Sequence, residues 1–524
     1  MKKVLAILLA LAMIFSLAAC GEKKEAKQPE EKDTKYGGSL TLVTVVDPVQ
    51  SGFPVSAGTD QNNLASTAIE RLGRYTEAGT IEGWLAKDFK ADPANLTVEL
   101  TLQEGVKYHD GTPFNAQAVC DVWDILVENG FANKLPADCK YEATGEYTVK
   151  VTLSSWTADT IKRLLIDAGQ MFSPTVYKDN GIDYLYTHIV GTGAFKQEEF
   201  VVGEKVTFVK NDEYWVEGLP YLDRIDWIVC TDQTAAMNML RTGDAKMILY
   251  PSIENYATLI DEGFERIGVD SCVNIAGQLG MFFASGNTAD PVSKLEVRQA
   301  INHAIDNDAL VKAFTYGYAV ASNQLGVAGS REYSNSVVGY EFSKDKAVAK
   351  LAEAGYTTEG SCVVTLTFTP QWEEIFTAVA NMIEENTNKI IKVNLDITDN
   401  IGPKILVSGD DPYASCCWWS APSLVYEWHR YYSAHPSTMV GKAVDLQAAG
   451  VIDLYQNCLT AKDDAEQKKF MDELAKVTVD DLCLYHAFYA TPSFYVGDGT
   501  IMDSDFGMSF NQQWKPEQTW IQAK

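Results

Sequence analysis

Basic residues are scarce in this chain. Lys and Arg number 43 against 71 Asp and Glu, which gives a formal net charge of −28. A protein that binds nucleic acid needs a basic surface that releases counterions from the phosphates, and this surface would repel them. The charge balance therefore excludes nucleic acid as a partner.

The sequence motifs of metal sites and enzymes are also missing. There are only six histidines, with no HExxH motif, no histidine pair four residues apart and no C-x-x-C. The G-x-S-x-G, GxxxxGK[ST] and GxGxxG signatures are absent as well. Ser343 and Lys346 formally make S-x-x-K, but no SDN or KTG motif accompanies them. We therefore expect no enzyme, no cofactor and no metal site.

The ten cysteines do not form a compact framework of the kind that small disulfide-rich proteins show. Nine of them remain when Cys20 is set aside, so at least one cannot pair within the chain. We expect most of these nine to be small buried hydrophobic residues.

Only one long apolar run is present, at the start of the chain. Two lysines precede an apolar stretch from Val4 to Phe15, and LAAC then ends at Cys20 with a glycine after it. The run is too short to span a membrane, and its charged start is typical of an export signal. It resembles the lipobox of bacterial lipoproteins, which implies cleavage after residue 19 and acyl chains on Cys20. Plain secretion is the alternative.

If Cys20 is acylated, the protein is held on the outer face of the cytoplasmic membrane, or in the periplasm if the cell has an outer membrane. The lipid anchor is then its membrane attachment. Residues 20–36 have almost no apolar side chains, so we expect a disordered tether there.

The remaining sequence alternates between strand and helix patterns. Residues 97–102 and 146–153 place apolar side chains at every second position, which predicts amphipathic strands. Between them Asn115 is a candidate N-cap and Asn129-Gly130 a helix end. The stripe between these signals consists of Val119, Val122, Trp123, Leu126 and Val127. Similar stripes at 297–305 and 376–383 lie beside strand patterns such as 363–368, so we predict an α/β protein with mixed sheets in two or three lobes.

Four segments, in order, resemble family 5 extracellular solute-binding proteins, the peptide/nickel class that supplies ABC importers. The first is LQEGVKYHDGTPF, and the others are GTGAFK with VTFVKNDEYWVEGLPYLDRIDW, KLEVRQAINHAIDNDALV, and AVAKLAEAGY. We expect their characteristic residues to be structural. Asp110, Gly111 and Pro113 would shape a turn, Tyr214 and Trp215 would be core, and Arg298 would make an ion pair.

The resemblance implies a two-lobed periplasmic-binding-protein-like fold of type II, in the large class with three subdomains, which closes on a ligand at a hinge. It places lobe I at 37–270 plus 491–524 and lobe II at 271–490, after a signal peptide at 1–19. Its implied partners are a small-molecule or peptide ligand and the permease and ATPase subunits of an ABC importer. We expect a monomer.

Three segments have the aromatic and polar residues expected of a ligand site between lobes. The first contains Val45 and Asp47, and the second follows the strand at 363–368. The third is YASCCWWSAPSLVYEW at 413–428, where a Trp pair on a strand would place one ring on each face. The sequence does not decide which ring faces the ligand. The candidate ligand-binding residues of the second and third segments are Thr369, Gln371, Trp372, Trp418, Trp419, Ser420 and Tyr426.

The third segment departs from the peptide binders of the family, in which an Asp soon after the Trp pairs with the peptide amine. Here no acid follows Trp419 until Glu427. A peptide ligand would then be held through its backbone. Stacking on Trp and Tyr would also suit a sugar, and a cation could use the same rings. We therefore expect a short peptide first, an oligosaccharide or other small organic solute second and a nickel chelate third, with a non-transport surface sensor as a further alternative.

Overall fold

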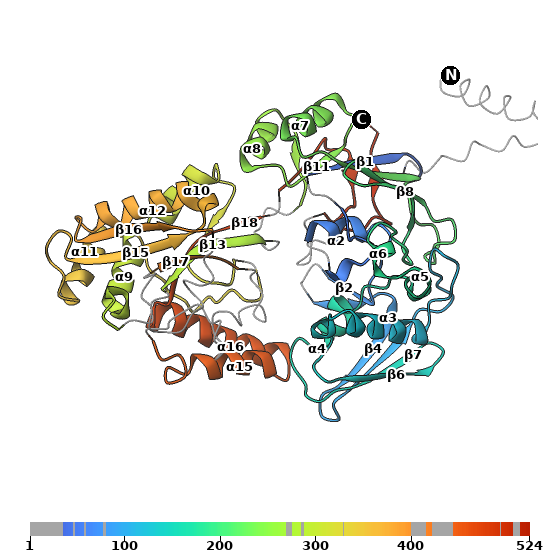
Figure 1. Cartoon of the computed structure of the whole chain (residues 1–524), viewed down its shortest axis with the longest axis horizontal. Helices are drawn as coiled ribbons and strands as arrows, with labels where there is room; N and C mark the ends of the chain where they lie inside the picture. Colours follow the sequence, from blue (N-terminus) through green and yellow to red (C-terminus); the bar gives the residue numbers. More distant parts are fainter. Residues whose placement is uncertain are drawn as a thin grey trace, which may run out of the picture.

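Two lobes make up the computed structural model (Figure 1). It describes residues 35–45, 48–56, 59–76, 80–268, 275–283, 288–328, 330–399, 416–421, 444–492, 494–506 and 514–523. One lobe is built on the sheet that contains β1, and the other is built on the sheet that contains β13. We call them lobe I and lobe II.

Lobe I contains a mixed sheet in which β1 lies between two parallel neighbours, β10 and β11. Antiparallel strands extend it on both sides. The order of the strands is β12 (Glu265–Arg266), β19 (Tyr495–Gly497), β11 (Met247–Leu249), β1 (Ser39–Thr44), β10 (Arg224–Val229), β9 (Lys205–Lys210) and β8 (Phe195–Val201).

Lobe II contains the second mixed sheet. Strand β15 is parallel to β16 and β17, whereas β13 and β18 are antiparallel to their neighbours. The order is β14 (Val320–Ala321), β18 (Tyr485–Pro492), β13 (Ile275–Phe283), β17 (Cys416–Ala421), β15 (Cys362–Phe368) and β16 (Ile391–Ile397).

A four-stranded antiparallel sheet forms a further subdomain beside lobe I (Figure 1). Its order is β4 (Ala86–Asp92), β5 (Thr97–Leu102), β7 (Thr148–Thr152) and β6 (Lys140–Gly145). The alternation predicted for residues 97–102 is confirmed, because Val98, Leu100 and Leu102 are fully buried. Two short ribbons, β2 (Gly73–Tyr75) with β3 (Ile81–Gly83) and β20 (Ile501–Met502) with β21 (Trp520–Ile521), complete the strands described.

Helix α3 (Ala116–Glu128) covers the four-stranded sheet, and it begins as predicted. The Asn115 side chain accepts a hydrogen bond from Ala118 N at 3.0 Å, which satisfies one of the unpaired N–H groups of the first turn. The predicted apolar stripe is buried except for Val127, whose side chain is 48% exposed. The prediction that Val127 belongs to the buried face is wrong. Ile125 belongs to that face instead.

The other helices of lobe I are α2, α4, α5, α6, α7 and α8, and those of lobe II are α9, α10, α11, α12, α15 and α16 (Figure 1). In lobe I they span Thr59–Ala65, Thr160–Lys162, Pro174–Asn180, Ile182–Leu185, Gln233–Thr242 and Ile253–Asp261. In lobe II they span Leu295–Ala304, Asn307–Phe314, Lys344–Glu353, Glu373–Asn386, Val451–Thr460 and Asp464–Lys476. Short helical segments include the π-helices η3 (Arg163–Asp167) and η7 (Val477–Asp481) and the 3-10 helices η4 (Pro291–Ser293) and η5 (Pro370–Trp372).

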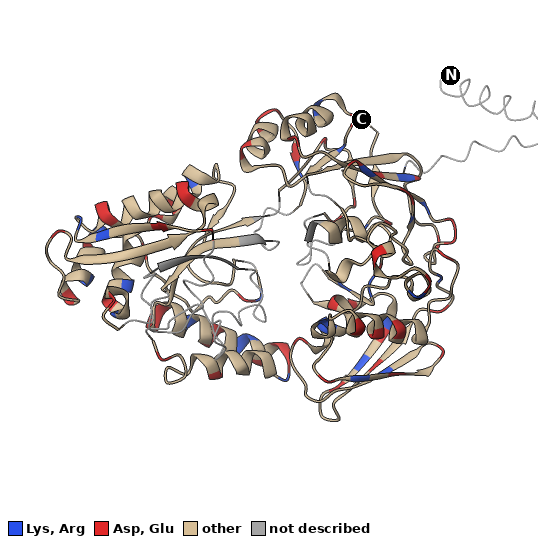
Figure 2. Cartoon of the chain, in the orientation of Figure 1, with Lys and Arg blue, Asp and Glu red and all other residues tan. Residues whose placement is uncertain are grey.

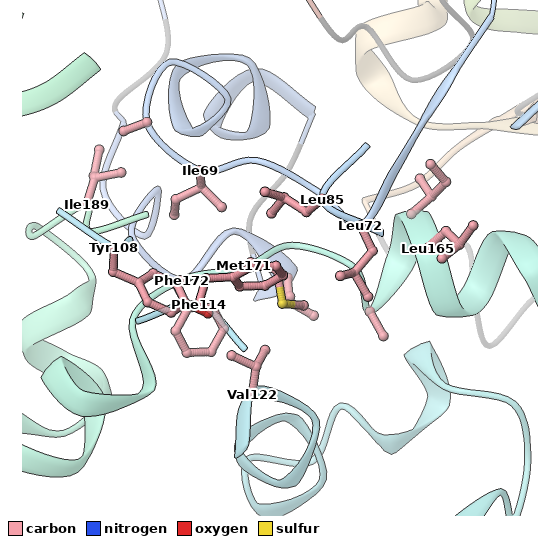
Figure 3. Packing of buried hydrophobic residues seen from close by; sticks show 14 of the residues in the cluster. Ile69, Leu72, Leu85, Tyr108, Phe114, Val122, Leu165, Met171, Phe172 and Ile189 are labelled. Atoms are coloured by element: carbon pink, nitrogen blue, oxygen red, sulfur yellow. The ribbon is translucent and has the colours of Figure 1, made fainter. Parts of the chain in front are cut away.

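One hydrophobic core joins the large sheet of lobe I to the four-stranded subdomain. Figure 3 shows Leu72, Leu85 and Leu165 near Phe114 and Phe172, although these residues come from separate parts of the chain. Lobe II has its own cores on the two faces of its sheet. Burial on this scale supplies the main driving force for folding. Acidic and basic residues are interspersed along the helices of both lobes (Figure 2).

Of the six cysteines whose side chains the structure describes, four are buried as predicted. Cys120, Cys362, Cys458 and Cys483 are buried and unpaired, and Cys139 and Cys230 are partly exposed and unpaired. Burial raises the pKa of the Cys458 thiol to about 12, so this group stays protonated and behaves as a small hydrophobic side chain.

Candidate functional site

The parallel strands of lobe I end at one edge of their sheet. Thr44 of β1 lies opposite Val229 of β10 and Leu249 of β11, so these three strands share one carboxyl edge. Strand β19 begins at the same edge, because Tyr495 lies opposite Leu249. Ligands of α/β proteins commonly bind at such carboxyl edges.

Lobe II offers a matching edge. Strands β15, β16 and β17 run in one direction, and Ala421 at the end of β17 lies opposite Gln278 near the start of β13. The chain passes between the sheets twice, from β12 to β13 and from β18 to β19. Both passages join the carboxyl edge of one sheet to that of the other (Figure 1).

The residues predicted from sequence gather at these two edges where the structure describes them. Val45 directly follows β1, and Thr369 directly follows β15. Residues 418–420 lie in β17, of which only the backbone is described. Asp47 and Tyr426 lie outside the described residues, as does Cys20.

The second predicted segment, at the end of β15, contains both exposed and buried side chains. Gln371 in η5 is exposed, whereas Trp372 is partly buried and packs against the core of lobe II. The Thr369 hydroxyl is buried and has no hydrogen-bond partner among the described residues. An unsatisfied buried hydroxyl is costly, so this atom is a candidate for a bond that a ligand or water supplies.

Sequence reasoning missed a hydrogen-bonded cluster at the edge of lobe I. The Asn63 amide donates to the Tyr250 hydroxyl at 2.7 Å, and the hydroxyls of Tyr250 and Tyr495 are 2.9 Å apart. Tyr250 adopts a φ of 54°, which is uncommon for a residue other than glycine. No local sequence signal could have joined three residues that lie so far apart in the chain.

A polar row continues from this cluster along lobe I. Gln170 donates to Asn62 Oδ1 at 2.6 Å, and its backbone pairs with that of Arg71. Burial lowers the pKa of the half-buried Arg71 to about 10, although the negative charge of Asp167 opposes the shift. Lys162 also bonds Asp167, at 2.6 and 2.8 Å.

Beside this row lies a partly buried carboxylate, that of Glu70, which the sequence analysis also missed. It accepts hydrogen bonds from Trp84 at 2.8 Å, Tyr214 at 2.8 Å, Trp215 at 3.0 Å and Thr192 at 2.8 Å. Burial raises the pKa of Glu70, and these four donors oppose the shift. Tyr214 and Trp215 do pack against the core as predicted, and they also hold this carboxylate.

The Arg298 prediction needs a larger correction. Its guanidinium makes no ion pair among the described residues and instead donates five hydrogen bonds to backbone carbonyl oxygens. The acceptors lie in η4 and just after η7, at Val292, Ser293, Leu482 and Cys483. Arg298 therefore ties two loops of lobe II together, which the spacing of charged residues in the sequence could not reveal.

The remaining motif residues have structural roles. The Asp110 carboxylate accepts bonds from the Thr112 backbone N–H at 2.8 Å and from the Ser173 hydroxyl, and Gly111 has a φ of 85°. Ser343 of the S-x-x-K match is the N-cap of α11, and Lys346 pairs with Glu341. The S-x-x-K match therefore marks the beginning of helix α11.

The described residues contain no cluster of three His, Cys, Asp or Glu side chains able to hold a metal ion. Burial lowers the pKa of His109 to about 4 and that of His486 to about 3, so both rings are neutral at pH 7. His486 is held between Asn302 and Asn307, at 2.6 and 2.9 Å. Within the same described ranges, no helix is both long and apolar enough to cross a membrane.

Known proteins resemble this chain in both sequence and fold. Residues 80–422, more than half of the chain, match the model for bacterial extracellular solute-binding proteins, family 5 Middle. The glutathione-binding protein GsiB of Salmonella typhi is 30% identical over 328 residues, which cover 61% of this chain and 62% of that protein. The matched region thus covers less than two thirds of this relative.

Two solved structures share the fold. HbpA2 from Haemophilus parasuis has a TM-score of 0.78 at 17% identity, covering 93% of this chain and 100% of that chain. DppA from Helicobacter pylori, in complex with the peptide STSA, has a TM-score of 0.66 at 18% identity, covering 94% and 99%.

The family match agrees with the sheet topology, with the two passages between lobes and with the order of the sequence motifs. Its members are receptors that bind solutes and carry out no chemistry on them. The chain belongs to the bacterial extracellular solute-binding proteins of family 5, a family of receptors and not of enzymes, and it shares their two-lobed fold.

Proposed function

We propose that the protein captures a short peptide between its lobes and delivers it to the permease and ATPase subunits of an ABC importer. The observation that carries the ligand class is the 30% identity to a glutathione-binding protein. Closure would occur because contacts to both lobes exist only in the closed state, so that ligand shifts the population toward it. Lobe I would comprise 37–270 and 491–524, and lobe II 271–490.

The ligand would lie between the carboxyl edges of the two sheets. Val45 and Asp47 would contribute from lobe I. From lobe II the contributors would be Thr369, Gln371, Trp372, Trp418, Trp419, Ser420 and Tyr426. The buried Thr369 hydroxyl without a partner among the described residues supports this assignment.

Thermal unfolding in the presence of candidate ligands tests the ligand class. The mature chain carrying Cys20→Ser would be heated with glutathione, other di- and tripeptides, oligosaccharides or nickel salts. A ligand at 100 times its dissociation constant adds about 2.7 kcal/mol to the stability of the folded state. A shift of the melting temperature with peptides supports the proposal, and shifts with sugars or nickel alone would contradict it.

The ligand edge can be tested with a matched pair of variants. Thr369→Val removes the buried hydroxyl of the proposed site and keeps its shape, so the bound peptide should lose affinity about tenfold. Thr242→Val removes an exposed hydroxyl at the end of α7 and should leave affinity unchanged. Equal affinities in the two variants would remove Thr369 from the site.

We further propose that the chain is a lipoprotein, exported by residues 1–19, anchored through Cys20 to the outer face of the cytoplasmic membrane and held at a distance by the tether at 20–36. The support is the LAAC sequence, which spans the predicted cleavage point between residues 19 and 20. Cells supplied with a labelled fatty acid should label the wild-type protein and not Cys20→Ser. Equal labelling of the two would contradict the anchor.

A further inference from the structure

The lobes touch at a second place, on the side of the molecule away from the two chain passages. The backbone N–H of Ala158, just before α4, donates to the carbonyl oxygen of Leu459 at 2.9 Å. Leu459 lies in the last turn of α15, where carbonyl groups lack donors within the helix. Lobe I therefore donates a hydrogen bond to a carbonyl group at the end of a helix in lobe II. Figure 1 shows α4 beside the ends of α15 and α16.

Two charged residues of lobe II also lie within electrostatic reach of lobe I. Arg331 and Glu332, in the segment between β14 and α11, lie near enough to Tyr75 of β2 for their charges to act on its hydroxyl. Glu332 is only 2% exposed. The charges of Asp167 and Arg71 in lobe I also shift the pKa of Tyr75, so charges from both lobes reach this residue.

Lobe II holds its side of the contact rigidly. A Cβ atom on Gly326 would lie 2.2 Å from the Glu332 carbonyl oxygen, so only glycine allows the chain to fold back here. Ser330 N donates to Val327 O at 2.8 Å, and Arg331 Nη1 donates to Asp464 Oδ1 at 2.9 Å. The Arg331 guanidinium also donates to Gln467. The segment is thus fixed on α16.

Hydrogen bonds within lobe I also hold its side of the contact in place. The Thr157 hydroxyl donates to Asp159 Oδ1 at 2.6 Å, and Arg163 Nε donates to Asp159 Oδ2 at 2.5 Å. These bonds hold the loop that presents the Ala158 N–H. Two preorganised surfaces lose little conformational entropy when they meet, so even a small contact can favour closure.

We propose that this contact, which we name the distal clasp, favours the closed state before ligand binds and so raises ligand affinity. The clasp consists of the hydrogen bond from the Ala158 N–H of lobe I to the Leu459 carbonyl oxygen of lobe II. The effect on ligand affinity rests on the proposed function, in which closure of the two lobes traps the ligand. Because this hydrogen bond exists only when the lobes meet, its loss lowers the ratio of closed to open protein by about fivefold.

Two clasp variants and one control test this. Arg331→Gln weakens the bonds that fix the lobe II side of the contact on α16, and Ala158→Pro removes the N–H that donates to the Leu459 carbonyl oxygen. Arg241→Gln is the control, since Arg241 makes a comparable exposed pair with Glu262 inside lobe I, at 2.6 and 2.7 Å. Thermal unfolding first establishes that each variant folds. If the proline variant does not, Arg331→Gln decides the outcome.

Small-angle X-ray scattering of the mature Cys20→Ser chain without ligand reports closure. The clasp variants should show a larger radius of gyration than wild type and the control. In Arg331→Gln the Ala158 amide should also exchange its hydrogen faster. Scattering and exchange equal to those of Arg241→Gln would overturn the clasp.

Glutathione, as the probe ligand, separates failure of the clasp from failure of the proposed function. If both hold, the clasp variants bind glutathione about fivefold more weakly than the control does. If the wild-type protein binds neither glutathione nor other peptides, the proposed function fails, while the difference in scattering still decides the clasp. Equal affinity and equal scattering in all variants would contradict the clasp alone.

Discussion

Each lobe encloses a charged side chain that belongs to a family motif or contacts one, and the two lobes satisfy that charge differently. In lobe I the Glu70 carboxylate accepts four hydrogen bonds from the side chains of Trp84, Thr192, Tyr214 and Trp215. In lobe II the Arg298 guanidinium donates five to backbone carbonyls. Buried charges are tolerated only with such compensation.

The difference determines what mutation can change. Side-chain donors can be removed one at a time, so the network around Glu70 can be taken apart in steps. Backbone acceptors cannot be removed, so the Arg298 network depends on the correct placement of η4 and of the chain after η7. Arg298 is therefore the more demanding of the two charges, and we expect the larger loss of stability there.

Arg298→Ala should lower the free energy of unfolding by about 4 kcal/mol, because it leaves buried carbonyl groups without donors. Denaturant unfolding measures this loss. Arg298→Lys keeps the charge but cannot reach both loops, and it should recover less than half of the stability. Full recovery by lysine would mean that charge, and not the fork of donors, is what the site requires.

Glu70→Gln should cost about 2 kcal/mol, less than Arg298→Ala, since the glutamine keeps one acceptor oxygen. Its amide NH₂ would face donors where the second carboxylate oxygen now accepts two bonds. Thr192→Val, which removes one of the four donors, should cost about 1 kcal/mol in the same measurement. A larger loss for Thr192→Val than for Glu70→Gln would show that the carboxylate is not the centre of the network.

The carboxyl group of Glu517 is expected to make the stability of the protein depend on pH. Burial raises the pKa of Glu517 to about 7, and the nearby charge of Glu70 raises it too, whereas Arg74, 3.9 Å away, and Lys515 lower it. Because this folded-state pKa exceeds the ordinary value of 4.5, the stabilising contribution is fully present below pH 4.5 and is lost as the pH rises through 7. A shift of this size corresponds to roughly 3 kcal/mol.

Glu517→Gln should therefore flatten the fall in stability between pH 5 and pH 8, as measured by thermal unfolding. Glu82→Gln is the matched control, because it removes an exposed carboxylate that bonds the same Arg74 at 2.7 Å. It should keep the wild-type profile. If both variants flatten the curve, the charge of Arg74 and not the burial of Glu517 governs the effect.

Local patterns predicted much of this fold. The start of α3 at Asn115 and the alternation in β5 follow from capping and from side-chain period, which act within a few residues. Four ordered motifs were enough to indicate the family that the comparison confirmed. The error at Val127 arose because the helical stripe was extended past the face that the sheet covers.

The candidate site was harder to predict, because its contacts join distant segments. Val45 and Thr369 could be placed at strand ends from local pattern. The Asn63, Tyr250 and Tyr495 cluster could not, since its members meet only when β11 and β19 pair. The same holds for Arg298, whose carbonyl partners have no side-chain signature.

The smallest expected effect distinguishes a satisfied hydroxyl from an unsatisfied one. Tyr214 donates to Glu70 at 2.8 Å, whereas the buried Tyr108 hydroxyl has no partner among the described residues. Tyr214→Phe should therefore lower the free energy of unfolding by about 1.5 kcal/mol, and Tyr108→Phe should raise it by about 0.5 kcal/mol. Denaturant unfolding of the two variants side by side tests this. A loss at Tyr108 as large as that at Tyr214 would mean that its hydroxyl is bonded to an ordered water, and the two sites would then be alike.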